Sequence, residues 1–192
     1  MLDFGGEMMW FGQRFPQEAA SETLGVTVEA NEAGIKPGRY GFLELYCTDN
    51  TCDCQRAMIR VYDDDLVLHA TLSYGWRDLK FYVDWMRGDI ETATTIPGIN
   101  LYTLQPQSNN ADAFLAIFRD LLRDETVAMR FQQHYQLFKA TSAMASPRKG
   151  LTPVEVTAQS KKRRRLNLKA KSFFSYGSRL LPPHVHKLPP TQ

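Results

Sequence analysis

The feature that most constrains how this chain can fold is the stretch 40–54, YGFLELYCTDNTCDC, which contains all three cysteines of the 192 residues. Its first half alternates between two faces, a two-residue period that is typical of a β-strand. One face carries Leu43, Leu45 and Cys47, and the other carries Phe42, Glu44 and Tyr46. Turn-forming side chains follow at 48–51, and Cys52 and Cys54 lie where a second strand, 56–62, starts back. The sequence therefore predicts a β-hairpin with three thiols at its tip.

Three converging thiols favour a metal site. Zn²⁺ binds thiolates at about 2.3 Å, and a structural zinc site has four donors. An odd number of cysteines, two of them separated by one residue, makes a poor disulfide framework. We predict that Cys47, Cys52 and Cys54 bind Zn²⁺. Two alternatives to metal binding stay open. The cysteines are small buried side chains at the end of a hairpin, or one of them is a redox thiol.

The fourth ligand is the open part of this prediction. His134 lies on the apolar side of a predicted helix and is the candidate we name, with Asp49, Asp53 or a water molecule as alternatives. We exclude His69 by register. If 63–65 forms the next turn, facing residue numbers add up to roughly 128, which places His69 opposite Ile59 and ~16 Å from the cysteines.

The strands after the hairpin extend it into a meander. An acidic turn at 63–65 leads into a third strand, 66–74, in which Leu66, Leu68, Ala70 and Leu72 form the core face and alternate with more polar residues. A further short strand at 24–29 and a short helix at 78–86 are also indicated. An antiparallel meander over about 41–74 needs a cover for its apolar face.

Two helices near the end of the folded part supply that cover. Apolar residues repeat every three or four positions at 110–123 and again at 126–140. The short connection between them predicts neighbouring, antiparallel helices that lie on the sheet. We therefore predict an α+β fold with one domain over 1–145, because 43% hydrophobic residues suffice for a core without disulfides.

The segment 146–192 differs from the rest in charge and composition. From residue 147 onward it holds 11 Lys or Arg against one acid, whereas the part before it holds 12 against 20. Low apolar content with charge of one sign predicts disorder. The basic run 161–165, Lys161-Lys162-Arg163-Arg164-Arg165, predicts contact with nucleic acid or the ribosome, and a solubilising tail is the alternative.

Several function classes lack their signatures. There is no run of about 18 apolar residues and no basic-then-apolar start, so we expect a cytoplasmic protein without a membrane partner. The H-E-x-x-H, zinc-deaminase, nucleophile-elbow and phosphate-loop motifs are absent. The sequence thus favours a structural zinc site in an interaction module that binds an unidentified protein. The alternative is a zinc-dependent hydrolase with Asp49 or Asp53 as general base.

Five segments together resemble a group of uncharacterised bacterial proteins that often end in a SEC-C motif, the small zinc-chelating module also found at the end of the secretion ATPase SecA. These segments are GRYGFLELYC at 38–47, CDCQR at 52–56, YGW at 74–76, PQS at 106–108 and HYQLFK at 134–139. The resemblance implies a cytoplasmic zinc-binding protein. The SEC-C cysteine pattern itself is absent from this chain, so the resemblance does not extend to partner binding through that module.

Overall fold

The computed structural model describes residues 7–31, 33–145 and 186–187. The described part starts with a short strand, a 3-10 turn and a short helix. It continues through the central strands to two longer helices, and a two-residue strand follows much later in the chain. In order, the elements are β1 Met8–Trp10, η1 Phe11–Gln13, α1 Pro16–Glu22, β2 Leu24–Val28, β3 Gly38–Cys47, β4 Arg56–Asp63, β5 Leu68–Gly75, α2 Leu79–Trp85, α3 Ile90–Ala93, β6 Gly98–Leu101, α4 Ala111–Leu121, α5 Glu125–Ala145 and β7 His186–Lys187.

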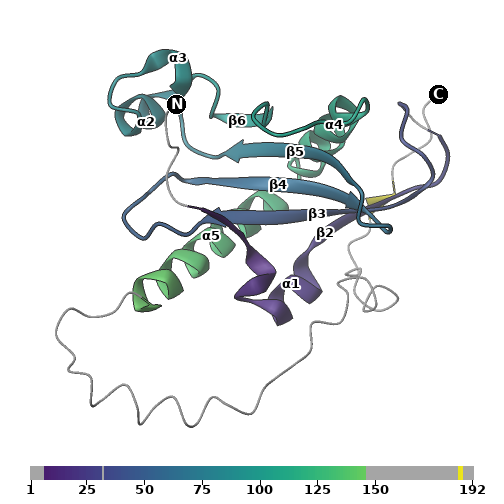
Figure 1. Ribbon diagram of the computed structural model, residues 1–192, viewed down its shortest axis with the longest axis horizontal. Coiled ribbons are helices and arrows are strands. Elements are labelled where there is room, and N and C mark those ends of the chain that lie inside the picture. Colours follow the sequence, from purple (N-terminus) through teal and green to yellow (C-terminus); the bar gives the residue numbers. More distant parts are fainter. Residues whose placement is uncertain (1–6, 32, 146–185, 188–192) are drawn as a thin grey trace, which may run out of the picture.

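The strands form one sheet in the order β6-β5-β4-β3-β2-β7, with β1 pairing with the last residues of β3 beyond the end of β2 (Figure 1). Every pairing is antiparallel except that of β7, which runs parallel to β2. The central strands β3, β4 and β5 are consecutive neighbours, as in a meander. The predicted α+β fold, with an antiparallel meander and two C-terminal helices, is confirmed.

Both C-terminal helices cover the same face of this sheet (Figure 1). Side chains at alternate positions of β3 contact them in turn, because successive residues of a strand point to opposite faces. The Phe42 ring stacks on Phe118 of α4 with centroids 5.6 Å apart, and the Tyr46 ring lies 5.6 Å from Phe138 of α5. The main core therefore lies between the sheet and α4 and α5.

The turn between β4 and β5 is wider than the sequence predicted. Asp63 accepts hydrogen bonds at one carboxylate oxygen from the backbone N–H groups of Asp65 and Val67, so the loop closes around residues 64–67. Leu66, expected on the core face, is 49% exposed and has a positive φ of 63°. The register shifts accordingly. Ile59 lies opposite Leu72, so the predicted pairing of Ile59 with His69 was wrong.

Several elements were not predicted from the sequence. These are β1, η1 and α1 near the start, α3, β6 at one sheet edge, and β7 within 146–192, all of them short and without clear periodicity. Burial in the tertiary structure specifies them: Phe11 of η1 is buried in the main core. The predicted tail 146–192 falls outside the described residues, except for β7. Among the described helices, none is long and apolar enough to cross a membrane.

Candidate metal centre

The three cysteines meet at one end of the sheet. Cys47 is the last residue of β3, and Cys52 and Cys54 lie in the loop before β4. Their three sulfur atoms all lie within 4.8 Å of one another. Cys47 and Cys54 are buried and Cys52 is half-buried, and none forms a disulfide. The predicted convergence of three thiols is confirmed.

The loop reaches this geometry through its own side chains. The Asp49 carboxylate accepts hydrogen bonds of 2.8 Å from both the backbone N–H and the hydroxyl of Thr51. The backbone N–H of Cys52 in turn donates to the Asp49 carbonyl oxygen at 3.3 Å. An aspartate that bonds the backbone two residues further on is a common way to make a turn. This turn carries Cys52 back toward Cys47.

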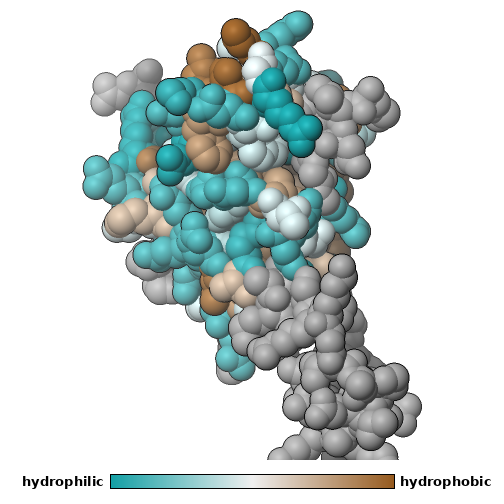
Figure 2. All heavy atoms as spheres, turned by 90° about the vertical axis from the view of Figure 1, so that its left-hand side faces the viewer, coloured by the Kyte–Doolittle hydropathy of each residue, from teal (hydrophilic) through white to brown (hydrophobic). Residues whose placement is uncertain are grey.

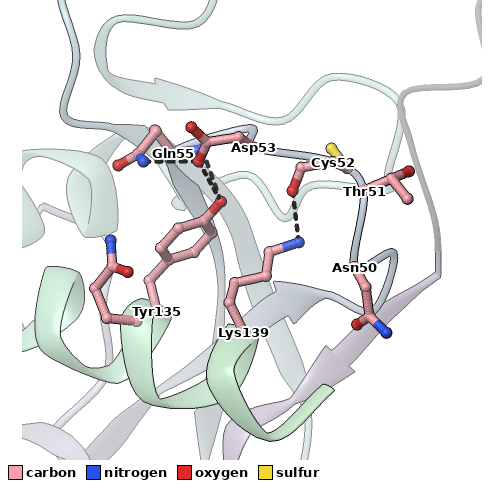
Figure 3. A pocket seen from close by; sticks show the side chains of 8 residues that line it. Asn50, Thr51, Cys52, Asp53, Gln55, Tyr135 and Lys139 are labelled. Carbon is pink, nitrogen blue, oxygen red and sulfur yellow. Dashed lines mark hydrogen bonds between the residues drawn. The ribbon is translucent and has the colours of Figure 1, made fainter. Parts of the chain in front are cut away.

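Lys139 of α5 holds the same loop from outside. Its ammonium donates to the carbonyl oxygens of Asp49 at 2.7 Å and Cys52 at 2.8 Å. Figure 3 shows the Cys52 carbonyl facing Lys139, whereas the Cys52 sulfur points away from it. The helix therefore binds the backbone of the loop, and the Cys52 thiol points away from the helix.

Gln55 fixes the exit of the loop in an unusual conformation. Its φ is 47°, a left-handed value that costs a residue other than glycine about 1–2 kcal/mol. Four groups compensate for this. The Gln55 carbonyl accepts from the Tyr82 hydroxyl at 2.7 Å, and its side-chain oxygen accepts from the Trp76 indole at 2.8 Å. Its side-chain amide donates to Asp53 at 2.7 Å, and its backbone N–H donates to the Tyr135 hydroxyl at 3.3 Å.

Tyr135 joins this loop exit to α5. Its hydroxyl donates to the Asp53 carboxylate at 3.0 Å, as the dashed line in Figure 3 shows. Burial raises the pKa of Tyr135, and the Cys54 and Asp53 charges nearby raise it further, so the hydroxyl stays protonated and able to donate. Tyr135 and Lys139 are one helical turn apart and hold the two ends of the cysteine loop.

The thiols interact with one another. Cys52 and Cys54 donate hydrogen bonds to the Cys47 sulfur, which lowers the pKa of Cys47. The same bond to Cys47 raises the pKa of Cys52, as the corresponding bond does for Cys54. A metal ion that binds all three sulfurs as thiolates displaces the protons that the thiols still carry.

His134, named above as a fourth ligand, has other partners. Its Nδ1 lies 2.6 Å from Glu44 of β3, and its Nε2 lies 3.0 Å from Glu22 of α1. Ionised carboxylates only accept hydrogen bonds, so both ring nitrogens donate, which is the imidazolium form. Phe11 stacks on the ring at 4.2 Å, and the Tyr46 hydroxyl also bonds Glu44. We call Glu44, His134, Glu22 and Tyr46 the buried charge cluster.

The remaining candidates are likewise engaged. His69 pairs with Asp63 at 2.9 Å, and its ring packs against Tyr40 and Phe114. Asp49 and Asp53 accept hydrogen bonds from Thr51 and Tyr135, as described. Over the described part of the chain, the group of candidate ligand atoms contains the three cysteines and neither histidine nor carboxylate. His134 thus stays a sequence-based prediction that the geometry does not support.

A polar pocket of about 250 Å³ lies between the cysteine loop and α5. Amide, hydroxyl and charged side chains make up most of its wall (Figure 3). The lining residues are Asn50, Thr51, Cys52, Asp53, Gln55, Tyr135, Gln136 and Lys139.

Seen from this end of the sheet, the surface is mainly hydrophilic (Figure 2). Hydrophobic residues gather toward the top of that view, on the side of α2 and α3, where Leu79 and Ile90 are 43% and 62% exposed.

Sequence reasoning missed the residues that hold the loop. Gln55 lies in the quoted segment 52–56, and Tyr135 and Lys139 lie in 134–139, but nothing there assigns them a role, and a lysine next to an apolar helix stripe is ordinarily solvated. One signal was available: Tyr135 and Lys139 are spaced i, i+4, so they share a helix face. Which loop that face contacts depends on how α5 lies across the sheet.

No protein-family model, no curated protein and no solved structure matches this chain. The resemblance to proteins with a SEC-C motif therefore stays a prediction. The function has to be argued from the three-cysteine centre itself.

Proposed function

We propose that this protein carries a structural metal centre in which Cys47, Cys52 and Cys54 bind Zn²⁺ as thiolates. The observation that supports the proposal is the placement of three sulfur atoms within 4.8 Å of one another at a loop held from two sides. Thiolates are the donors that thiophilic ions such as Zn²⁺ prefer. The ion would cross-link the end of β3 to the residues before β4.

Such a cross-link contributes folding free energy, because the donors converge only in the folded chain. An ion that binds the native state alone stabilises it by about 2.7 kcal/mol when its concentration is 100 times its Kd. Lys139 and Tyr135 extend the effect to α5, since they hold the same loop. A metal-dependent shape for this end of the sheet suits a protein-interaction module.

The competing function is a zinc-dependent hydrolase, and the contacts favour the structural role over it. A catalytic zinc needs an open position that faces the substrate. The Cys52 sulfur points away from Lys139 and the pocket beside it (Figure 3). Both aspartates proposed as general bases accept hydrogen bonds that build the loop. The pocket therefore has polar walls but no base poised over the thiols.

The basic tail supports a second, separate proposal. The excess of Lys and Arg after residue 146 would attract nucleic acid or the ribosome, with an affinity that falls steeply as salt rises. Truncation after Ser146, followed by RNA-binding titrations at two salt concentrations, tests this. Binding that is unchanged by the truncation removes the proposal.

The metal proposal is tested by elemental analysis of the reduced, purified protein and of Cys54→Ala. We expect about one zinc per chain in the wild type and none in the variant. Thermal melts with and without a chelator complete the test, because the chelator should lower the Tm of the wild type only. A folded wild type that holds no metal after incubation with Zn²⁺ overturns the proposal.

A further inference from the structure

Three thiolates leave a four-coordinate ion one donor short, and the described histidines and carboxylates do not join the group. Strand β1 offers another kind of donor. It pairs with β3 at the cysteine end, where Met8 lies opposite Cys47 and Met9 lies opposite Tyr46. A methionine thioether is a soft sulfur donor, like the thiolates beside it.

The hydrogen bonds around this pair show how close Met8 and Cys47 are. The backbone N–H of Thr48 donates to the carbonyl of Glu7 at 2.9 Å. This bond joins the residues next to Met8 and Cys47, not Met8 and Cys47 themselves. That is the pattern of a non-hydrogen-bonded antiparallel pair, whose Cα atoms are ~4.5 Å apart and whose side chains lie closest. Residues that face each other in this way project to the same side of the sheet. Met8 therefore projects to the side of Cys47.

Met8 is not a fully exposed side chain. It is half-buried and packs against the main core, to which Cys47 and Cys54 belong, as Met9 does. Its unbranched side chain has three rotatable bonds, so the sulfur can adjust to an ion beside Cys47. Met9, next in the strand, projects to the opposite side with Tyr46. Met9 is therefore a neighbouring methionine whose side chain points to the side of the sheet opposite Met8, which makes it a matched control.

We infer that Met8 supplies the fourth sulfur of the centre, and that the centre prefers the soft monovalent ion Cu(I) to Zn²⁺. This inference rests on the proposed thiolate centre and refines the identity of its ion. Thiolate and thioether donors suit several soft ions, Cu(I) and Zn²⁺ among them, but methionine is not among the usual ligands of Zn²⁺, so a four-sulfur set that includes a thioether favours Cu(I).

The test compares the wild type with Met8→Leu and the matched control Met9→Leu, both of which remove one thioether and keep an apolar side chain. The proteins are loaded anaerobically with Cu(I) and titrated with a chromophoric Cu(I) chelator. Loss of a group that only hydrogen-bonds a metal ligand costs about 10–100-fold in metal affinity, so loss of a donor should weaken Cu(I) binding at least about tenfold. We expect that loss in Met8→Leu only, with Zn²⁺ affinity equal in all three proteins.

A direct readout separates coordination from packing. In protein labelled with selenomethionine, X-ray absorption at the copper edge should show a selenium neighbour, which is lost in Met8→Leu and kept in Met9→Leu. No copper–selenium contact, or equal Cu(I) affinity in both variants, overturns the role of Met8. Zn²⁺ binding tighter than Cu(I) binding in the wild type overturns the preference. Failure of the thiolate centre itself looks different, because neither ion then binds and Cys54→Ala behaves as the wild type.

Discussion

Helix α5 is attached to the sheet at two places. Protein groups alone form the first attachment, whereas the second lies beside a group of thiols that could bind an ion. In the buried charge cluster, His134 lies between Glu44 and Glu22, and the protein's own groups satisfy every bond described. At the cysteine loop, Tyr135 and Lys139 bind the backbone and side chains around three thiols, which an ion holds together under the proposed function. Under that proposal, neighbouring residues on one helix make one permanent and one metal-dependent attachment.

The two attachments also differ in how accessible they are to ions and small molecules in solution. Glu44 and His134 are 6% and 5% exposed, so ions and solutes have little access to them. Cys52 is only half-buried, so the cysteine loop is more accessible to metal and to chelators than this pair. Metal should therefore change the attachment near Lys139 and leave that of His134 unchanged.

The largest expected effect comes from breaking the permanent attachment. Glu44→Leu removes the buried carboxylate of the cluster and leaves the His134 charge with only the partly exposed Glu22 beside it, which costs about 3–5 kcal/mol of unfolding free energy. Urea denaturation with and without chelator measures the loss. We expect the same loss in both conditions, and a loss that appears only with metal would contradict the separation of the two attachments.

Removing the metal should have the next largest effect. At a metal concentration 100 times its Kd, chelation should lower the unfolding free energy by about 2.7 kcal/mol. Hydrogen exchange should then show faster opening of the cysteine loop and of α5 near Lys139, while amides next to Glu44 keep their protection. Uniform loss of protection over the whole sheet would show that the two attachments are not independent.

Lys139→Met tests the link between the loop and the helix. Hydrogen bonds from a charged group to two carbonyls are lost, for an expected cost of about 1.5–3 kcal/mol and a weaker affinity for metal. Lys80→Met is the matched control, because Lys80 is 84% exposed and pairs only with Asp84 among the contacts described. Such an exposed pair contributes little to stability, because water and salt screen it. Equal metal affinities in the two variants would exclude a role for Lys139 at the centre.

The smallest expected effect is that of pH on the buried charge cluster. Burial lowers the pKa of His134, but the hydrogen bonds and charges of Glu44 and Glu22 outweigh it, and the pKa is raised from 6.5. The contribution is therefore complete below pH 6.5 and is lost as pH rises through the raised value. We expect the stability advantage of the wild type over His134→Gln to shrink on going from pH 6 to pH 9. An advantage that grows over this range would reverse the assigned sign.

The thiol group was predictable because its information is local. Alternation in β3 and the turn-forming residues around Asp49 specify a hairpin, and a hairpin of that length brings Cys47 close to Cys52 and Cys54. The role of His134 was not predictable in this way. Its partners Glu44 and Glu22 are 90 and 112 residues away in sequence, and no local pattern specifies which of them the ring meets.

The sequence by itself determined the α+β class, the meander and the meeting of three thiols, because strand period, helix period and turn chemistry act over a few residues. The tertiary structure alone decided that α5 uses His134 for the sheet and Lys139 for the loop, and that Met8 faces Cys47. Those contacts depend on the register of β1 and the position of α5. Both are set by core packing between residues far apart in the chain, and a one-residue shift would send each side chain to the other face.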